Sequence, residues 1–233
     1  MSITNRIIDS IKQYHCEMEQ DTNHRFYSWD HCYKVFCDAR HTGSQDYDYL
    51  SLHLAFYLAS WGMYRGSSQL LKKKDYKVHL PAVMIILRKE YDCLLGFEYT
   101  CDDQKKMNEV RIKLEDLNNK LTEYLQSAGV SPTGRLISKI ILGTLGCTPA
   151  YDTFFCNALN DDNNITELLG QGHPKLLQNK WDIDSLFLLA DYYKKNSKSF
   201  EELRKKYKVF GVYDYPQMKL LDMGLWQIGS NMK

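Results

Sequence analysis

Residues 125–135 read LQSAGVSPTGR and separate the two clearest helical patterns of the chain. Before them, apolar residues recur at alternating spacings of three and four over residues 104–127, and residues 133–145 repeat this pattern after them. Gly129 follows the first pattern, where a left-handed helix terminus costs glycine little. Ser131 and Pro132 are a typical N-cap and N1 pair for a second helix. The stretch therefore predicts a tight hairpin of two helices.

The rest of the sequence is also helical in pattern, and no stretch shows sustained strand alternation. We expect an all-α fold of one unit with two interleaved helical lobes. Residues 45–160 would form the core lobe, while 1–44 and 161–233 would form the second lobe, with the helices of both chain ends packed together. Further helices are expected at about 3–18, 29–38, 46–61, 81–93, 182–195, 199–207 and 216–228, and loops at 40–46, 99–106 and 160–164.

Composition sets broad limits on function. The chain has 233 residues, of which 44% are hydrophobic, so an extensive core is expected. Its 30 basic and 29 acidic residues neither require nor exclude nucleic acid as a partner. The seven cysteines contain no CxxC pair, which favours free thiols in a reducing cytoplasm. No apolar run approaches 18 residues, so no membrane span is expected.

The hairpin and the sequence after it carry the functional signal. Backbone N–H groups at such a turn, beside a helix N-terminus, can bind a phosphate. Residues 129–155, GVSPTGRLISKIILGTLGCTPAYDTFF, run from the hairpin through an apolar helix to Asp152, which aromatic and apolar residues follow. This segment resembles the signature of the helix-hairpin-helix DNA glycosylase superfamily, which includes endonuclease III and AlkA. Residues 52–71, LHLAFYLASWGMYRGSSQLL, are similar to the early apolar helix of that superfamily.

The resemblance implies an enzyme that removes a base from double-stranded DNA. Asp152 takes the place of the catalytic aspartate, and the hairpin carbonyls would hold a monovalent cation, with no other cofactor or metal. The chain would act as a monomer on DNA that carries a modified base. The hairpin residues that would contact DNA are Gly129, Val130, Ser131, Thr133 and Gly134.

A carboxylate at Asp152 suits this chemistry, because breaking an N-glycosidic bond develops positive charge on the sugar. We expect Asp152 in the first turn of a helix opened by Thr148 and Pro149, where the helix dipole favours the ionised form. The alternative is that Asp152 only stabilises that helix.

Aromatic and basic residues supply candidates for a base pocket or wedge. The early helix ends near Trp61, which the resemblance places at the lesion-probing position, and the crowded stretch NHRFYSWDHCY occupies residues 23–33. A flipped base needs stacking and hydrogen-bonding partners of these types. Core packing is the competing interpretation for these aromatic residues. The candidates are Trp61, Tyr64, Arg65, Tyr151, Trp29 and His31, and the basic run Lys72, Lys73 and Lys74 would follow the phosphate backbone or lie in a solvated loop.

The chain departs from the superfamily pattern at several positions. Ser131 replaces the second hairpin glycine, and Thr133 or Gly134 occupies the region of the lysine that gives some members a lyase step. Lys139, the nearest candidate, is more than a helical turn away from that position. No cysteine follows Cys156, so the iron–sulfur loop of endonuclease III is absent. We therefore expect a monofunctional glycosylase, which releases the base without cutting the strand.

Two other functions stay open. Arg25 and His31 have five residues between them, a spacing similar to that of the all-α HEPN ribonucleases. A non-catalytic helical DNA-binding module would need neither Asp152 nor this pair. The histidines show no HxxxH or HExxH spacing, so no metal site is expected. Members of the superfamily remove alkylated purines, mispaired or damaged bases and hypermodified phage bases. DNA repair and antiviral defence are therefore both open as the role of this protein.

Overall fold

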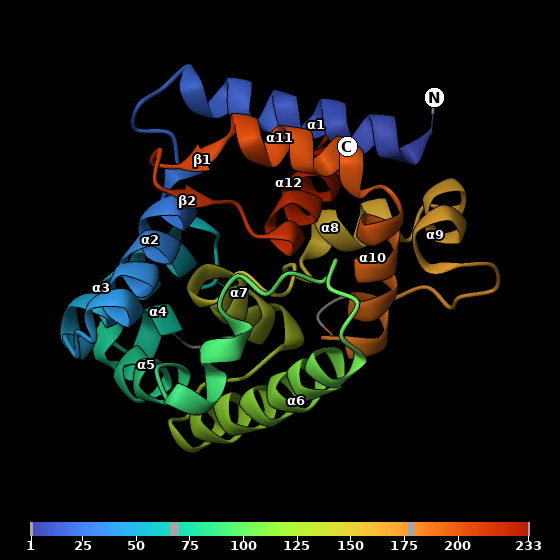
Figure 1. Ribbon diagram of the computed structural model, residues 1–233. Coiled ribbons are helices and arrows are strands. Elements are labelled where there is room, and N and C mark those ends of the chain that lie inside the picture. The colour runs from blue at the N-terminus through green and yellow to red at the C-terminus, as the bar shows by residue number, and fades with distance from the viewer. Residues whose placement is uncertain (1, 66–69, 177–179, 233) are drawn as a thin grey trace.

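The computed structural model describes residues 2–65, 70–176 and 180–232, and helices dominate these parts of the chain (Figure 1). The expected all-α class is confirmed, and the described strands form one two-stranded antiparallel hairpin. The elements are α1 (Ile3–Glu19), α2 (Tyr27–Thr42), α3 (Tyr47–Ser60), α4 (Leu70–Lys73), η2 (Tyr76–His79), α5 (Leu80–Ile86), η3 (Lys89–Leu94), α6 (Gln104–Ser127), α7 (Gly134–Thr144), α8 (Thr153–Leu159), α9 (Asp162–Leu169), α10 (Ile183–Lys195), α11 (Ser197–Lys206), β1 (Lys208–Val209), β2 (Tyr213–Asp214) and α12 (Gln217–Asn231).

Two element boundaries differ from the sequence expectation for local reasons. The helix expected at 81–93 is interrupted, because Arg88 adopts an extended conformation between α5 and η3. The expected loop at 160–164 instead contains the start of α9, because the side chain of Asp161 accepts a hydrogen bond from the backbone N–H of Asn163 and caps that helix.

The helices of the two chain ends pack together. Helix α1 lies along α12, which also packs against α8, while α2 packs against α3 and α7 (Figure 1). Gly229 permits the close approach of α12 and α8, because a Cβ atom at this position would stand 1.9 Å from the carbonyl oxygen of Phe154. Buried apolar side chains from α1 to α12 form one continuous core. This packing brings a C-terminal helix directly beside the segment that carries Asp152.

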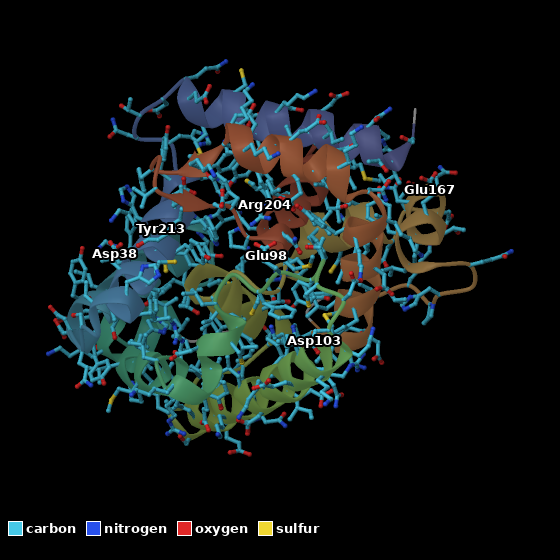
Figure 2. All side chains as sticks on the ribbon, viewed as in Figure 1. Asp38, Glu98, Asp103, Glu167, Arg204 and Tyr213 are labelled. Atoms are coloured by element: carbon cyan, nitrogen blue, oxygen red, sulfur yellow. The ribbon has the colours of Figure 1, made fainter. Side chains whose placement is uncertain are left out.

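Polar contacts fasten the C-terminal part to the rest of the molecule. Arg204 of α11 forms an ion pair with Glu98, which precedes α6, at 2.5 Å, and Tyr213 of β2 donates a hydrogen bond to Asp38 of α2 at 2.7 Å (Figure 2). The described helices include none that is both long enough and apolar enough to cross a bilayer.

Candidate active site

A cleft of about 280 Å³ opens where the end of α3, one face of α7, the start of α8 and α12 meet. The group that stands out chemically is Asp152, which the sequence predicts as the catalytic carboxylate. Cationic and aromatic side chains surround it. The residues that line the cleft are Arg25, Trp61, Met63, Arg135, Lys139, Asp152, Thr153, Phe154 and Trp226.

Asp152 is the N-cap of α8. Its Oδ1 accepts hydrogen bonds from the backbone N–H groups of Phe154 and Phe155, both at 3.1 Å. Its Oδ2 accepts one from the Lys139 Nζ at 2.8 Å, and the residue is only 8% exposed. The carboxylate is therefore fixed in direction by three donors, at the wall of an open cleft.

The expectation that Thr148 and Pro149 open the helix is wrong, because the helix begins at Thr153. The backbone N–H of Ala150 donates to Asp222 Oδ1 at 2.9 Å, and that of Tyr151 donates to Ser138 Oγ at 3.0 Å. These two bonds hold the chain out of helical geometry until Asp152 supplies the cap.

A stack of aromatic rings forms the inner wall. Phe26 stacks on Tyr14 with ring centroids 4.0 Å apart and on Trp61 at 5.7 Å. Trp226 stands edge-on to Trp61 at 5.3 Å and to Phe154 at 5.4 Å. The rings pack on one another from three helices and from the residues just before α2 and just after α3, so Trp61 is held beside the cleft.

Two cations of the cleft come from one face of α7. Arg135 and Lys139 are four residues apart, so their side chains leave the helix on the same side. Arg135 Nη2 donates to the Thr153 hydroxyl at 2.9 Å, and Lys139 pairs with Asp152. The sequence pattern did not identify Lys139 as a site residue, because Lys139 is more than a helical turn away from the position of the superfamily lysine. The signal that could have identified both residues is a pair of cations at helical spacing in an otherwise apolar helix.

Arg25 also reaches the cleft from the turn before α2. Its guanidinium carbon lies 5.0 Å from the centroid of the Trp61 ring and 5.5 Å from that of Trp226. Its Nη1 donates a long hydrogen bond of 3.4 Å to the carbonyl of Ser60. The sequence placed Arg25 in a ribonuclease pair with His31, but His31 does not line this cleft and packs against Phe210 at 4.7 Å.

Several residues predicted for the base pocket lie outside the cleft. Tyr151 is fully buried and its hydroxyl contacts Asp182 and Ser185, and Trp29 is fully buried with its Nε1 donating to the Leu142 carbonyl at 3.0 Å. Tyr64 shares a hydrogen bond with His79 at 2.8 Å, and Arg65 is exposed. Of the six predicted pocket residues, the cleft therefore contains Trp61 alone.

The predicted hairpin joins α6 to α7. Gly129 has φ of 72°, and the backbone N–H groups of Gly129 and Val130 donate to the Gln126 and Leu125 carbonyls, which is a Schellman motif. The second helix is capped by Thr133, whose Oγ1 accepts from the Leu136 N–H at 3.2 Å, and not by Ser131.

The turn leaves backbone groups available to a ligand. Among the described residues, the N–H groups of 131, 133 and 134 and the carbonyls of 128–132 have no hydrogen-bond partner. The Lys74 Nζ lies 3.9 Å from the position that a Cβ on Gly129 would take, so a lysine ammonium group lies next to the turn. The side chain of Lys72 lies outside the described part of the chain. The hairpin thus combines donors for a phosphate with carbonyl oxygens of the kind that a monovalent cation needs.

A second buried pair lies behind the ring stack. Lys219 donates to Asp222 at 3.1 Å, and both belong to α12. Burial lowers the pKa of Lys219, although the neighbouring carboxylates of Asp222 and Asp30 oppose this. Burial also raises the pKa of Asp30 to about 7, against the hydrogen bond that it accepts from the Tyr215 hydroxyl at 2.7 Å.

The described residues contain no group of three or more His, Cys, Asp and Glu side chains arranged to hold a metal ion. Comparisons with protein-family models, with curated proteins and with solved structures find no match to this chain. Its function is therefore inferred from the chemistry of the cleft and the hairpin.

Proposed function

We propose that the protein is a monofunctional DNA glycosylase that hydrolyses the N-glycosidic bond of a modified base in double-stranded DNA. The observation that carries the proposal is the position of Asp152, a carboxylate fixed by three donors at the wall of a cleft with aromatic and cationic sides. A flipped base needs such rings for stacking, and a sugar cation needs such a carboxylate.

In the reaction, the bond between C1′ and the base nitrogen breaks and its electron pair leaves with the base. Asp152 faces the positive charge that develops on the sugar and lowers the energy of that state. A water oxygen then bonds to C1′ and its proton passes to the departing base, so the products are the free base and an abasic sugar. Lys139 fixes the carboxylate, because its Nζ lies 2.8 Å from Oδ2.

The hairpin would anchor the DNA backbone beside this cleft. Its free N–H groups at 131, 133 and 134 suit a phosphate oxygen, and Lys74 adds a positive charge at the turn. The free carbonyls of 128–132 would take the monovalent cation that the superfamily resemblance implies.

The position of Lys139 favours a second candidate, a glycosylase with a lyase step. The amine could attack C1′ in place of water and form an imine with the opened sugar, which would lead to strand cleavage. Borohydride reduces an imine to a stable amine, so it would trap the protein on the DNA. Trapping that is lost in Lys139→Met would replace the monofunctional proposal with this one.

The experiment that tests the proposal is base release. The purified protein is incubated with duplexes that contain deaminated, oxidised, alkylated or glucosylated bases, and free bases are identified by mass spectrometry. Asp152→Asn should lower the release rate by roughly 10²–10³-fold, the usual cost of removing a charge-stabilising group. Asp161→Asn is the matched control, because Asp161 also caps a helix but lies outside the cleft.

The rival functions give different outcomes in the same experiment. Release that survives Asp152→Asn, or no release from any duplex, would overturn the proposal. RNA cleavage that is lost in an Arg25→Ala, His31→Ala variant would support the ribonuclease. Those two residues face different surroundings, with Arg25 in the cleft and His31 against Phe210.

A further inference from the structure

Cationic side chains of the protein already lie close to the rings that would stack against a flipped base. Trp61 has three of them near its ring: the Lys139 Nζ at 4.8 Å, the Arg25 guanidinium at 5.0 Å and the Lys219 Nζ at 5.7 Å from the centroid. The face of an aromatic ring is negative and attracts a positive charge within about 6 Å. In this cleft that attraction is already satisfied by the protein itself.

Arg25 also places a positive charge near two further rings of the stack, Phe26 and Trp226. Its guanidinium lies 5.4 Å from the centroid of Phe26 and 5.5 Å from that of Trp226. Among the described residues its one hydrogen bond is the long contact to the Ser60 carbonyl, and it makes no ion pair. Arg25 is exposed and no carboxylate pairs with it, so its positive charge is available to a ligand that enters the cleft.

The charges and the unpaired donors of the residues that line the cleft also favour a ligand that is not cationic and that accepts hydrogen bonds. Three cationic side chains, Arg25, Arg135 and Lys139, line the cleft beside a single carboxylate. Two buried N–H donors, Trp61 Nε1 and Arg135 Nε, have no hydrogen-bond partner among the described residues. A buried donor without an acceptor is costly, so a ligand acceptor that reached either atom would bind favourably.

From this arrangement we infer that the cleft selects bases by charge: it takes neutral or anionic bases rich in hydrogen-bond acceptors and rejects cationic ones. This inference rests on the proposed glycosylase function and narrows its substrate class. Purines alkylated on a ring nitrogen, such as 7-methylguanine and 3-methyladenine, carry a formal positive charge in DNA. They would meet the cations of the cleft, and Lys139 and Arg25 already supply the positive charge that the Trp61 ring attracts. Oxidised, deaminated or acceptor-bearing hypermodified bases meet no such repulsion.

A pair of bases that differ chiefly in charge tests the inference by binding. Duplexes carry one 5-carboxymethyluracil or one 5-aminomethyluracil on a 2′-fluorinated sugar, which resists cleavage, and the wild-type protein is titrated by fluorescence anisotropy. The carboxymethyl duplex should bind at least about tenfold more tightly than the aminomethyl duplex, because the charge of the substituent reverses inside the cleft. Equal affinities, or tighter binding of the aminomethyl duplex, would overturn the inference.

Variants show whether the cleft is responsible. Arg25→Gln should reduce the affinity ratio at least about threefold, since it removes a positive charge of the cleft lining that no carboxylate pairs with. Arg88→Gln is the matched control, because Arg88 is an exposed arginine that lies outside the cleft and contacts Glu90. A ratio that is unchanged in Arg25→Gln, or reduced equally in Arg88→Gln, would contradict the assignment.

The base-release panel separates failure of this inference from failure of the proposed function. Release of alkylated purines in preference to neutral bases, lost in Asp152→Asn, would leave the glycosylase in place and overturn the charge selection. No Asp152-dependent release from any duplex would remove the glycosylase, and the inference on substrate class would go with it. Preferential release of neutral or anionic bases would support both.

Discussion

Lys139–Asp152 and Lys219–Asp222 are both buried lysine–aspartate pairs, but their surroundings differ. The first joins α7 to the start of α8 at 2.8 Å, and its aspartate lines the cleft. The second lies within one turn of α12 at 3.1 Å, enclosed by Tyr14, Trp29 and Trp61. Side-chain exposure is 11% for Asp152 and 7% for Asp222, so burial alone does not distinguish them.

The difference lies in what each carboxylate holds. Asp152 binds the N–H groups of its own helix and keeps one side toward the cleft. Asp222 accepts a hydrogen bond from the N–H of Ala150, two residues before Asp152. It therefore fixes the segment that positions the Asp152 carboxylate. A buried ion pair is weak evidence for stability, because desolvation offsets its attraction. The comparison therefore supports the proposal that the open pair takes part in the chemistry and that the enclosed pair positions it.

The largest expected effect on stability comes from breaking the enclosed pair. Asp222→Ala leaves Lys219 buried without its partner and leaves the Ala150 N–H without an acceptor. We expect the free energy of unfolding to fall by about 3–5 kcal/mol, the usual cost of removing one member of a buried pair. Urea denaturation followed by circular dichroism measures this.

The double variant Lys219→Met, Asp222→Leu is the control for that prediction. It removes both charges at once, so the part of the loss that comes from the unpaired Lys219 should return, while the Ala150 N–H still lacks its acceptor. A single variant that unfolds within about 1 kcal/mol of the wild type would show that Lys219 is not desolvated as its burial indicates.

A smaller, pH-dependent effect is expected at Asp30, the second carboxylate near Lys219. Its pKa is about 7 in the folded protein and near 3.8 when unfolded, so unfolding releases a proton between these pH values. The free energy of unfolding then decreases as pH rises from about 4 to 7. Asp30→Asn removes this loss, so the variant should gain about 2–4 kcal/mol over the wild type between pH 4 and 8. Denaturation at several pH values measures the gain.

Asp38→Asn is the matched control, because Asp38 also accepts a hydrogen bond from a tyrosine hydroxyl. Partial burial acts to raise its pKa, but hydrogen bonds from Lys34 and Tyr213 outweigh this and lower it. Its carboxylate therefore stabilises the fold above pH 4, and the control variant should lose stability there. A gain of the same sign in both variants would contradict the assignment for Asp30.

Local patterns in the sequence were enough to predict most of the long helices and the hairpin, but not α9 and only part of the site. Apolar spacing and Gly129 predicted α6, the turn and α7, because those signals act within a few residues. Trp226 could not be placed beside Asp152, because 74 positions separate them and only the packing of α12 on α8 joins them. Tyr151 and Trp29 were assigned to a pocket because an aromatic residue gives the same sequence signal in a core and in a cleft.

The smallest expected effect on stability comes from Lys139→Met in the open pair. Asp152 would keep its two backbone donors, and water from the cleft could reach Oδ2, so the free energy of unfolding should fall by only about 1–2 kcal/mol. Base release should fall roughly tenfold, because the carboxylate is held less firmly. A stability loss as large as that of Asp222→Ala would mean that the two pairs are equivalent. A complete loss of base release with little change in stability would instead make Lys139 itself a participant in the reaction.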